Sequence, residues 1–181
     1  LEILEYKFNY KIWNQTERTI NCYDWFEQYF ASNYDDDLKM DYVESLFDGD
    51  YSLKIKDATI NKYNYIFEKL NLKPGMKLLD CGCGTGTWML YCKNKGINVI
   101  GITLSTEQAI KVRKKGLVVY VNDYRILNKK FINKFDAITL LGSTEHNCLS
   151  RGILNGNYIT NKCNETRTEI FKIIKSYLRK S

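Results

Sequence analysis

The sequence has few of the features that mark membrane, secreted or repetitive chains. Its 181 residues include one proline, Pro74, and one histidine, His146. No apolar run is long enough to span a bilayer, and no basic start with a small-residue cleavage site marks a signal peptide. There are no repeats and no low-complexity linker. These absences predict a soluble, cytoplasmic protein, and the 44% hydrophobic content suits one domain with a real core.

Cysteine pairs are also scarce, although the chain has six cysteines. They lie far apart or inside expected core elements, and Cys81 and Cys83 are too close in sequence to pair easily with each other. No second pair stands at the spacing of a zinc site. We therefore expect reduced, structural thiols and no metal centre.

The chain lacks the basic signatures of nucleic-acid binding despite a net charge of +6 and a pI near 8.9. Its lysines are scattered over the expected helices, with no arginine-rich stripe and no RNA-binding motif. A solvated, lysine-rich surface is the favoured interpretation, and nucleic acid is not an expected partner. Peripheral contact with an anionic membrane remains open, and the sequence does not specify an oligomeric state.

Apolar residues follow an alternation of strands and helices from residue 57 onward. The expected strands are 77–79, 98–102, 117–121 and 135–141, and the expected helices are 23–31, 57–70, 87–95, 106–115 and 165–179. Such alternation predicts an α/β, Rossmann-like fold with a largely parallel sheet covered on both faces. We divide the chain into an N-terminal helical cap or lid, residues 1–56, and a cofactor-binding domain, residues 57–181.

The most informative segment is a glycine-rich turn that follows the first strand. Asp80 is followed by Gly82, Gly84 and Gly86, so the backbone is bare at every second position. The next strand ends near Thr103, which completes a βαβ unit of the kind that binds nucleotide-containing cofactors. A dinucleotide site would place its third glycine one residue later. The alternative is a tight turn in a domain that binds no cofactor.

The acidic-x-G-x-G-x-G pattern resembles the first motif of class I S-adenosylmethionine-dependent methyltransferases. This cofactor has no pyrophosphate, so no helix N-terminus need face one, and a carboxylate with bare backbone can hold its amino-acid end. Residues 57–148 further resemble the cyclopropane-fatty-acid synthase and mycolic-acid methyltransferase family. The matching segments are LKPGMKLLDCGCG at 72–84, GITLSTEQ at 101–108, DYR at 123–125, FD at 135–136 and EH at 145–146.

The resemblance implies a set of cofactor contacts. They are Tyr42, Asp80, Gly82, Gly84 and Gly86 at the amino-acid end, Thr103, Leu104 and Gln108 at the ribose, Asp123 and Tyr124 at the adenine, and Leu141 from below. Alternatives stay open for two of them. Tyr124 could be an ordinary surface aromatic, and Leu141 could be plain core.

The resemblance also implies methyl(ene) transfer to the double bond of an unsaturated acyl chain on a lipid. In the family a bound bicarbonate then removes the proton, and Glu145 matches the glutamate that holds it; the alternative is a solvated loop carboxylate. Glu44 stands where the family has a bicarbonate-site cysteine and is a second candidate catalytic residue, as a base itself. We interpret His146 as a structural or indirectly acting residue.

The family fold has seven strands, whereas this sequence supplies four. We therefore expect the last three strands to be missing and the 135–141 strand to present an apolar edge. Other functions stay open: a small-molecule N- or C-methyltransferase on the same scaffold, or a truncated, inactive domain that only binds the cofactor.

Overall fold

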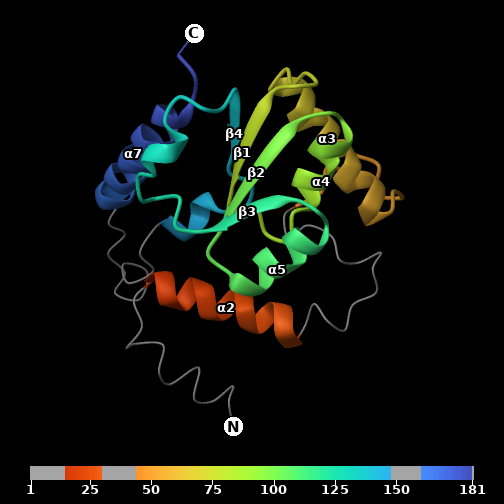
Figure 1. The fold of residues 1–181 in the computed structure, drawn as a ribbon. Helices are drawn as coiled ribbons and strands as arrows, with labels where there is room; N and C mark the ends of the chain where they lie inside the picture. Colours follow the sequence, from red (N-terminus) through yellow and green to blue (C-terminus); the bar gives the residue numbers. More distant parts are fainter. Residues whose placement is uncertain (1–14, 30–43, 148–159, 181) are drawn as a thin grey trace.

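The computed structural model describes residues 15–29, 44–147 and 160–180. Its centre is a parallel four-stranded sheet in the order β3-β2-β1-β4 (Figure 1). The strands are β1 (Lys77–Cys81), β2 (Asn98–Thr103), β3 (Val118–Val121) and β4 (Ala137–Thr139). The helices are α2 (Gln15–Tyr29), α3 (Ile55–Lys69), α4 (Thr87–Asn94), α5 (Thr106–Lys114) and α7 (Thr160–Tyr177), with the short 3-10 turns η2 (Lys129–Phe131) and η3 (Thr144–Asn147). The predicted α/β class and parallel sheet are confirmed.

Two apolar layers cover the sheet because alternate strand residues face opposite sides. Leu78 points into a core that α3, α4 and α5 complete with side chains such as Trp88 and Val112. Its neighbour Leu79 points into the other core, which contains Tyr177 of α7 and Phe131 of η2. Burial on both faces explains the continuous apolar runs of β1, β2 and β4, whereas β3, at the sheet edge, buries only Val119.

The observed bounds differ most from the predicted ones at three elements. Helix α2 starts at Gln15 rather than near residue 23, and α7 starts at Thr160 rather than near residue 165. Strand β4 is shorter than the predicted 135–141, because only residues 137–139 pair with β1. Beyond it the chain turns away at Gly142, which has φ +62°.

The free edge of β4 is partly covered by the chain that follows α7. Phe135 forms a parallel bridge with Leu178, and the Arg179 amide donates to the Phe135 carbonyl over 2.9 Å. The Arg179 guanidinium also pairs with Asp136 at 2.7 Å. Within the described residues, the predicted apolar edge is thus blunted at its start.

Helix α2 belongs to the predicted N-terminal cap and lies across the carboxyl ends of the strands, beside α5 (Figure 1). Polar contacts hold it there. Glu27, which is 2% exposed, forms an ion pair with Lys111, and the Ser105 hydroxyl donates to Asp24. The domain boundary near residue 56 stays a prediction.

The described residues contain neither a membrane-spanning helix nor a metal-binding cluster. No helix in ranges 15–29, 44–147 and 160–180 is long and apolar enough to cross a membrane. The same part of the chain holds no cluster of three or more histidine, cysteine or acidic residues that could bind a metal.

Candidate active site

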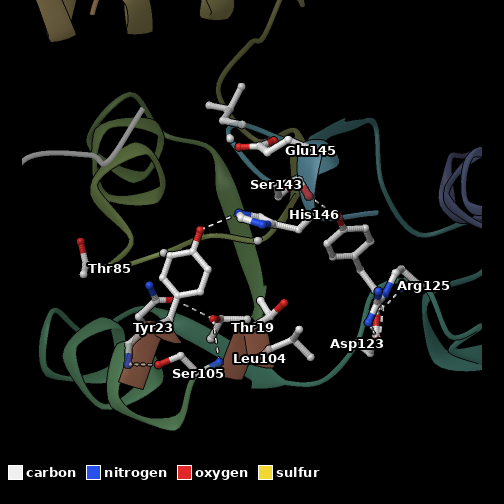
Figure 2. Close-up of a pocket in the computed structure, with 17 residues that line it drawn as sticks. Thr19, Tyr23, Thr85, Leu104, Ser105, Asp123, Arg125, Ser143, Glu145 and His146 are labelled. Carbon is white, nitrogen blue, oxygen red and sulfur yellow. Dashed lines mark hydrogen bonds and ion pairs between the residues drawn. The ribbon is translucent and has the colours of Figure 1, made fainter. Parts of the chain in front are cut away.

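A pocket opens at the carboxyl ends of β1, β2 and β3, between these strands and α2 (Figure 2). In an open parallel sheet this is the position where ligands bind. The lining residues come from α2, the glycine turn, the ends of β2 and β3 and the segment after β4: Thr19, Tyr23, Gly82, Gly84, Thr85, Thr103, Leu104, Ser105, Gln108, Asp123, Tyr124, Arg125, Leu141, Gly142, Ser143, Glu145 and His146.

The glycine turn after β1 leaves open space at Gly84. Gly84 has φ +51°, and a Cβ added there would meet no atom within 4 Å. Gly82 is different, because a Cβ there would lie 2.5 Å from the Cβ of Ser143. Gly86 does not line the pocket; its φ is +79°, and an added Cβ would lie 3.1 Å from Val112. Gly84 therefore opens the pocket floor, while Gly82 and Gly86 permit close packing around it.

Asp80 lies beneath this turn rather than on the pocket wall. It is 3% exposed, and its carboxylate accepts a 2.8 Å hydrogen bond from the Thr139 hydroxyl. The same hydroxyl accepts from the Trp88 indole at 3.2 Å. This chain of bonds joins β1, β4 and α4 and fixes the base of the turn. The predicted contact of Asp80 with a cofactor stays a prediction.

At the end of β2, polar side chains are held in place by hydrogen bonds to one another. The Thr103 hydroxyl donates to the Gln108 side-chain oxygen at 2.8 Å, and Ser105 caps α5 by accepting from the Gln108 amide at 3.0 Å. All three residues are buried and line the pocket, with Leu104 between them. The structure thus brings the predicted ribose contacts Thr103, Leu104 and Gln108 to one site.

At the end of β3, the predicted adenine contacts stand in the wall. Tyr124 is 8% exposed and donates to the Ser143 carbonyl at 2.9 Å, so it is not a surface aromatic. The Arg125 guanidinium holds Asp123 through bonds of 2.6 to 3.0 Å, and this hydrogen bonding raises the pKa of Arg125. Arg125 also donates to Thr16 at 2.7 Å, which ties α2 to this end of the pocket.

The opposite wall carries Glu145 and His146 from η3, together with Tyr23 from α2 (Figure 2). The Tyr23 hydroxyl and the His146 Nε2 atom lie 2.7 Å apart in a hydrogen bond, with their rings edge to face. Burial, and then the nearby Glu145 carboxylate, raise the pKa of Tyr23. His146 therefore stands on the pocket wall itself, closer to the site than its sequence interpretation implied. Leu141 lines the same side and is only partly buried.

In addition to Asp80 and Gly86, which do not line the pocket, two predicted site residues stay without support from the described structure. Tyr42 lies outside the described residues. Glu44 is exposed and does not line the pocket, so its catalytic role stays a prediction.

Sequence reasoning also missed lining residues, chiefly Thr19 and Tyr23 of α2 and Arg125. Thr19 and Tyr23 are four residues apart, so they share one face of a helix. This spacing would have indicated the pocket face of α2 only if the helix predicted at 23–31 had been extended back to residue 15.

Three buried thiols, of Cys81, Cys83 and Cys92, are held in the unreactive neutral form. Burial, and secondarily the Asp80 carboxylate, raise the pKa values of Cys81, Cys83 and Cys92 above the ordinary thiol range. Buried neutral thiols are poor nucleophiles and poor metal ligands. Each is a free cysteine, which agrees with the structural role expected from the sequence.

A family model described as mycolic acid cyclopropane synthetase matches residues 11–165. Among curated proteins, a probable fatty acid methyltransferase of Mycobacterium tuberculosis is 44% identical over 100 residues, which cover 51% of this chain and 23% of that protein. The cyclopropane-fatty-acyl-phospholipid synthase of Escherichia coli is 40% identical over 97 residues, covering 51% of this chain and 24% of that protein. The match therefore spans about a quarter of these relatives' length.

The solved structures similar to this chain also include cyclopropane synthases. The chain superimposes on the mycolic acid cyclopropane synthase CmaA1 complexed with SAH and CTAB with a TM-score of 0.63 and 27% identity, covering 74% of this chain and 47% of that one. The cyclopropane synthase MmaA2 from Mycobacterium tuberculosis gives a TM-score of 0.62 and 29% identity over the same shares.

Proposed function

The chain belongs to the mycolic acid cyclopropane synthetase family, and we propose that it transfers a methyl(ene) group from S-adenosylmethionine to the double bond of a phospholipid acyl chain. S-adenosylmethionine supplies an activated methyl group on a positively charged sulfur. The reaction replaces the carbon–sulfur bond by a bond to one alkene carbon. Loss of a proton from the transferred methyl then closes the ring, so S-adenosylhomocysteine and one proton leave with the cyclopropane.

The observation that carries this proposal is the open space at Gly84, continued by polar groups at the ends of the next two strands. A ligand lying across β1, β2 and β3 would meet bare backbone, then Thr103 and Leu104, then Asp123. That order suits an amino-acid end, a ribose and an adenine. The residues present therefore fit S-adenosylmethionine, with Tyr124 beside the base.

For proton removal we propose Glu145 as the group that holds or replaces the base. Glu145 lines the pocket next to the paired Tyr23 and His146 side chains, and it is exposed. Bicarbonate is the proposed proton acceptor, held in part by Glu145. Removal of bicarbonate from the buffer should then slow ring closure, and Glu145→Gln should reduce the rate without weakening S-adenosylmethionine binding.

The test is to incubate the protein with S-adenosylmethionine and vesicles of a cis-monounsaturated phospholipid, and then to analyse the released fatty acids by mass spectrometry. The proposal predicts fatty acids heavier by one CH₂ unit that no longer contain a double bond. Small amines added to the same mixture should remain unmodified. Methylated amines with unchanged acyl chains would replace the lipid acceptor by a small-molecule one. Cofactor binding without either product would indicate a binding domain.

A further inference from the structure

The segment between β3 and β4 exposes aliphatic side chains and lysines together. Ile126, Leu127 and Ile132 are 63%, 47% and 36% exposed. Three lysines of the same segment, Lys129, Lys130 and Lys134, are exposed as well. We call these six residues the 126–134 surface. Clusters of exposed apolar side chains on a soluble domain commonly mark interaction sites.

The backbone under this surface is held firmly, so the exposed side chains cannot simply turn inward. The Tyr177 hydroxyl accepts from the Asn128 amide at 2.8 Å and donates to the Ile126 carbonyl. At the other end of the segment, the Asn133 amide donates to the Ser176 carbonyl at 3.0 Å. Phe131, only 5% exposed, anchors the middle in the core beside α7. Figure 1 shows the segment after β3 running alongside α7.

The charge of this surface is one-sided. Between residues 118 and 134 the only acidic side chain is Asp123, which Arg125 already neutralises. Among the described residues, none of the three lysines of the surface has an ion-pair partner. Lys130 and Lys134 also border a groove of about 490 Å³ in which Val118 and Tyr120 of β3 are 54% and 47% exposed. An unpaired basic rim around aliphatic groups complements an anionic, partly apolar partner.

We propose that the 126–134 surface docks the protein on an anionic phospholipid bilayer, with Ile126, Leu127 and Ile132 entering the interface. The lysines then meet the negatively charged phosphates of the lipids. Protein–protein interfaces are instead enriched in aromatic residues and arginine and depleted of lysine. The composition of this surface therefore favours lipid over an acidic protein partner.

The location of the surface agrees with this role. Ile126 directly follows Arg125, a residue of the pocket wall, so the docking surface adjoins the proposed active site. The proposal rests on the proposed function only in that the acyl chains of phospholipids are found in bilayers. Vesicle binding itself requires no turnover, so the two proposals can fail separately.

The experiment is co-sedimentation with vesicles of equimolar phosphatidylglycerol and phosphatidylcholine, compared with vesicles of phosphatidylcholine alone. The wild-type protein should bind the anionic vesicles more tightly, and added salt should weaken that binding. The variant K129Q/K130Q should bind about thirtyfold more weakly, because two lysine contacts are lost. The variant I126S/L127S should lose about tenfold or more.

Matched controls lie on α3. Lys54→Gln with Lys69→Gln removes two exposed charges at the ends of that helix, and Ile55→Ser with Ile60→Ser removes two aliphatic side chains that are 53% and 40% exposed. Both controls should bind vesicles like the wild type. Circular dichroism and S-adenosylhomocysteine binding check that every variant is folded.

The proposal is overturned if folded variants of the 126–134 surface bind as well as the wild type, or if the α3 controls lose as much. Absence of wild-type binding to either vesicle overturns it in favour of an acidic protein partner. Lysine-dependent vesicle binding without methyl transfer would instead leave the docking surface standing and remove the proposed function.

Discussion

Replacing Gly84 by alanine separates the folding role of the glycine turn from its proposed binding role. Gly84 has φ +51° and open space around the position of a Cβ. A non-glycine residue in the left-handed region costs roughly 1–2 kcal/mol, and no clash adds to this value. The added methyl would nevertheless occupy the floor of the pocket. Forcing it against a bound ligand should cost about 1–3 kcal/mol more, which corresponds to about 5- to 150-fold weaker binding.

Gly75 provides the matched control for this substitution. It has φ +89°, an added Cβ there also meets no atom within 4 Å, and it lies in the turn before β1, away from the pocket. Gly75→Ala should lower the free energy of unfolding as much as Gly84→Ala, yet leave S-adenosylmethionine affinity unchanged. Urea unfolding and titration calorimetry measure the two quantities. Equal affinity in both variants would refute the placement of the cofactor over Gly84.

Three further outcomes follow from the same structure. Gly82→Ala should lower the unfolding free energy by about 3 kcal/mol, because the backbone strain of a positive φ adds to a steric clash with Ser143. A loss in urea unfolding no larger than that of Gly75→Ala would contradict this. Tyr23→Phe should lower the free energy of unfolding by about 1 kcal/mol, because the hydrogen bond to His146 is lost. Folding raises the pKa of Tyr23, so the stability linked to its proton is present below pH 10 and is lost as the pH rises through the raised pKa. Unfolding measured from pH 7 to 11 should show that this alkaline loss disappears in the variant. The buried thiols of Cys81, Cys83 and Cys92 act in the same direction, because above pH 9 the unfolded chain releases their protons while the folded chain retains them. The free energy of unfolding should therefore fall by about 1.4 kcal/mol per pH unit for each thiol. A Cys92→Ser variant whose unfolding free energy falls with pH as steeply as that of the wild type would argue against this.

The sheet and the glycine turn could be predicted because their signals are local. Short apolar runs, separated by segments with helical spacing of apolar residues, predict the bounds of β1, α4, β2 and α5 to within a few residues. The glycines of the turn must adopt positive φ, which glycine adopts without strain, so their spacing alone shows the turn.

The contacts that join α2 to the pocket walls could not be predicted, because they connect residues far apart in the sequence. The pairing of Tyr23 with His146 joins residues 123 positions apart, and the contact of Arg125 with Thr16 spans 109. The bridge between Phe135 and Leu178 at the edge of β4 likewise joins distant segments. The spacing of Asp80 before the glycines predicts a cofactor contact, but it does not show that Asp80 is buried and hydrogen-bonded to Thr139 on the neighbouring strand. The cofactor contact stays a prediction.

The most direct test of the central claim is titration calorimetry of the wild-type protein with S-adenosylmethionine, S-adenosylhomocysteine and NAD. We expect one S-adenosylmethionine site per chain, competition by S-adenosylhomocysteine, and no binding of NAD, because the pocket offers bare backbone and polar strand ends rather than a pyrophosphate site. Absence of S-adenosylmethionine binding, or equally tight binding of NAD, would contradict it.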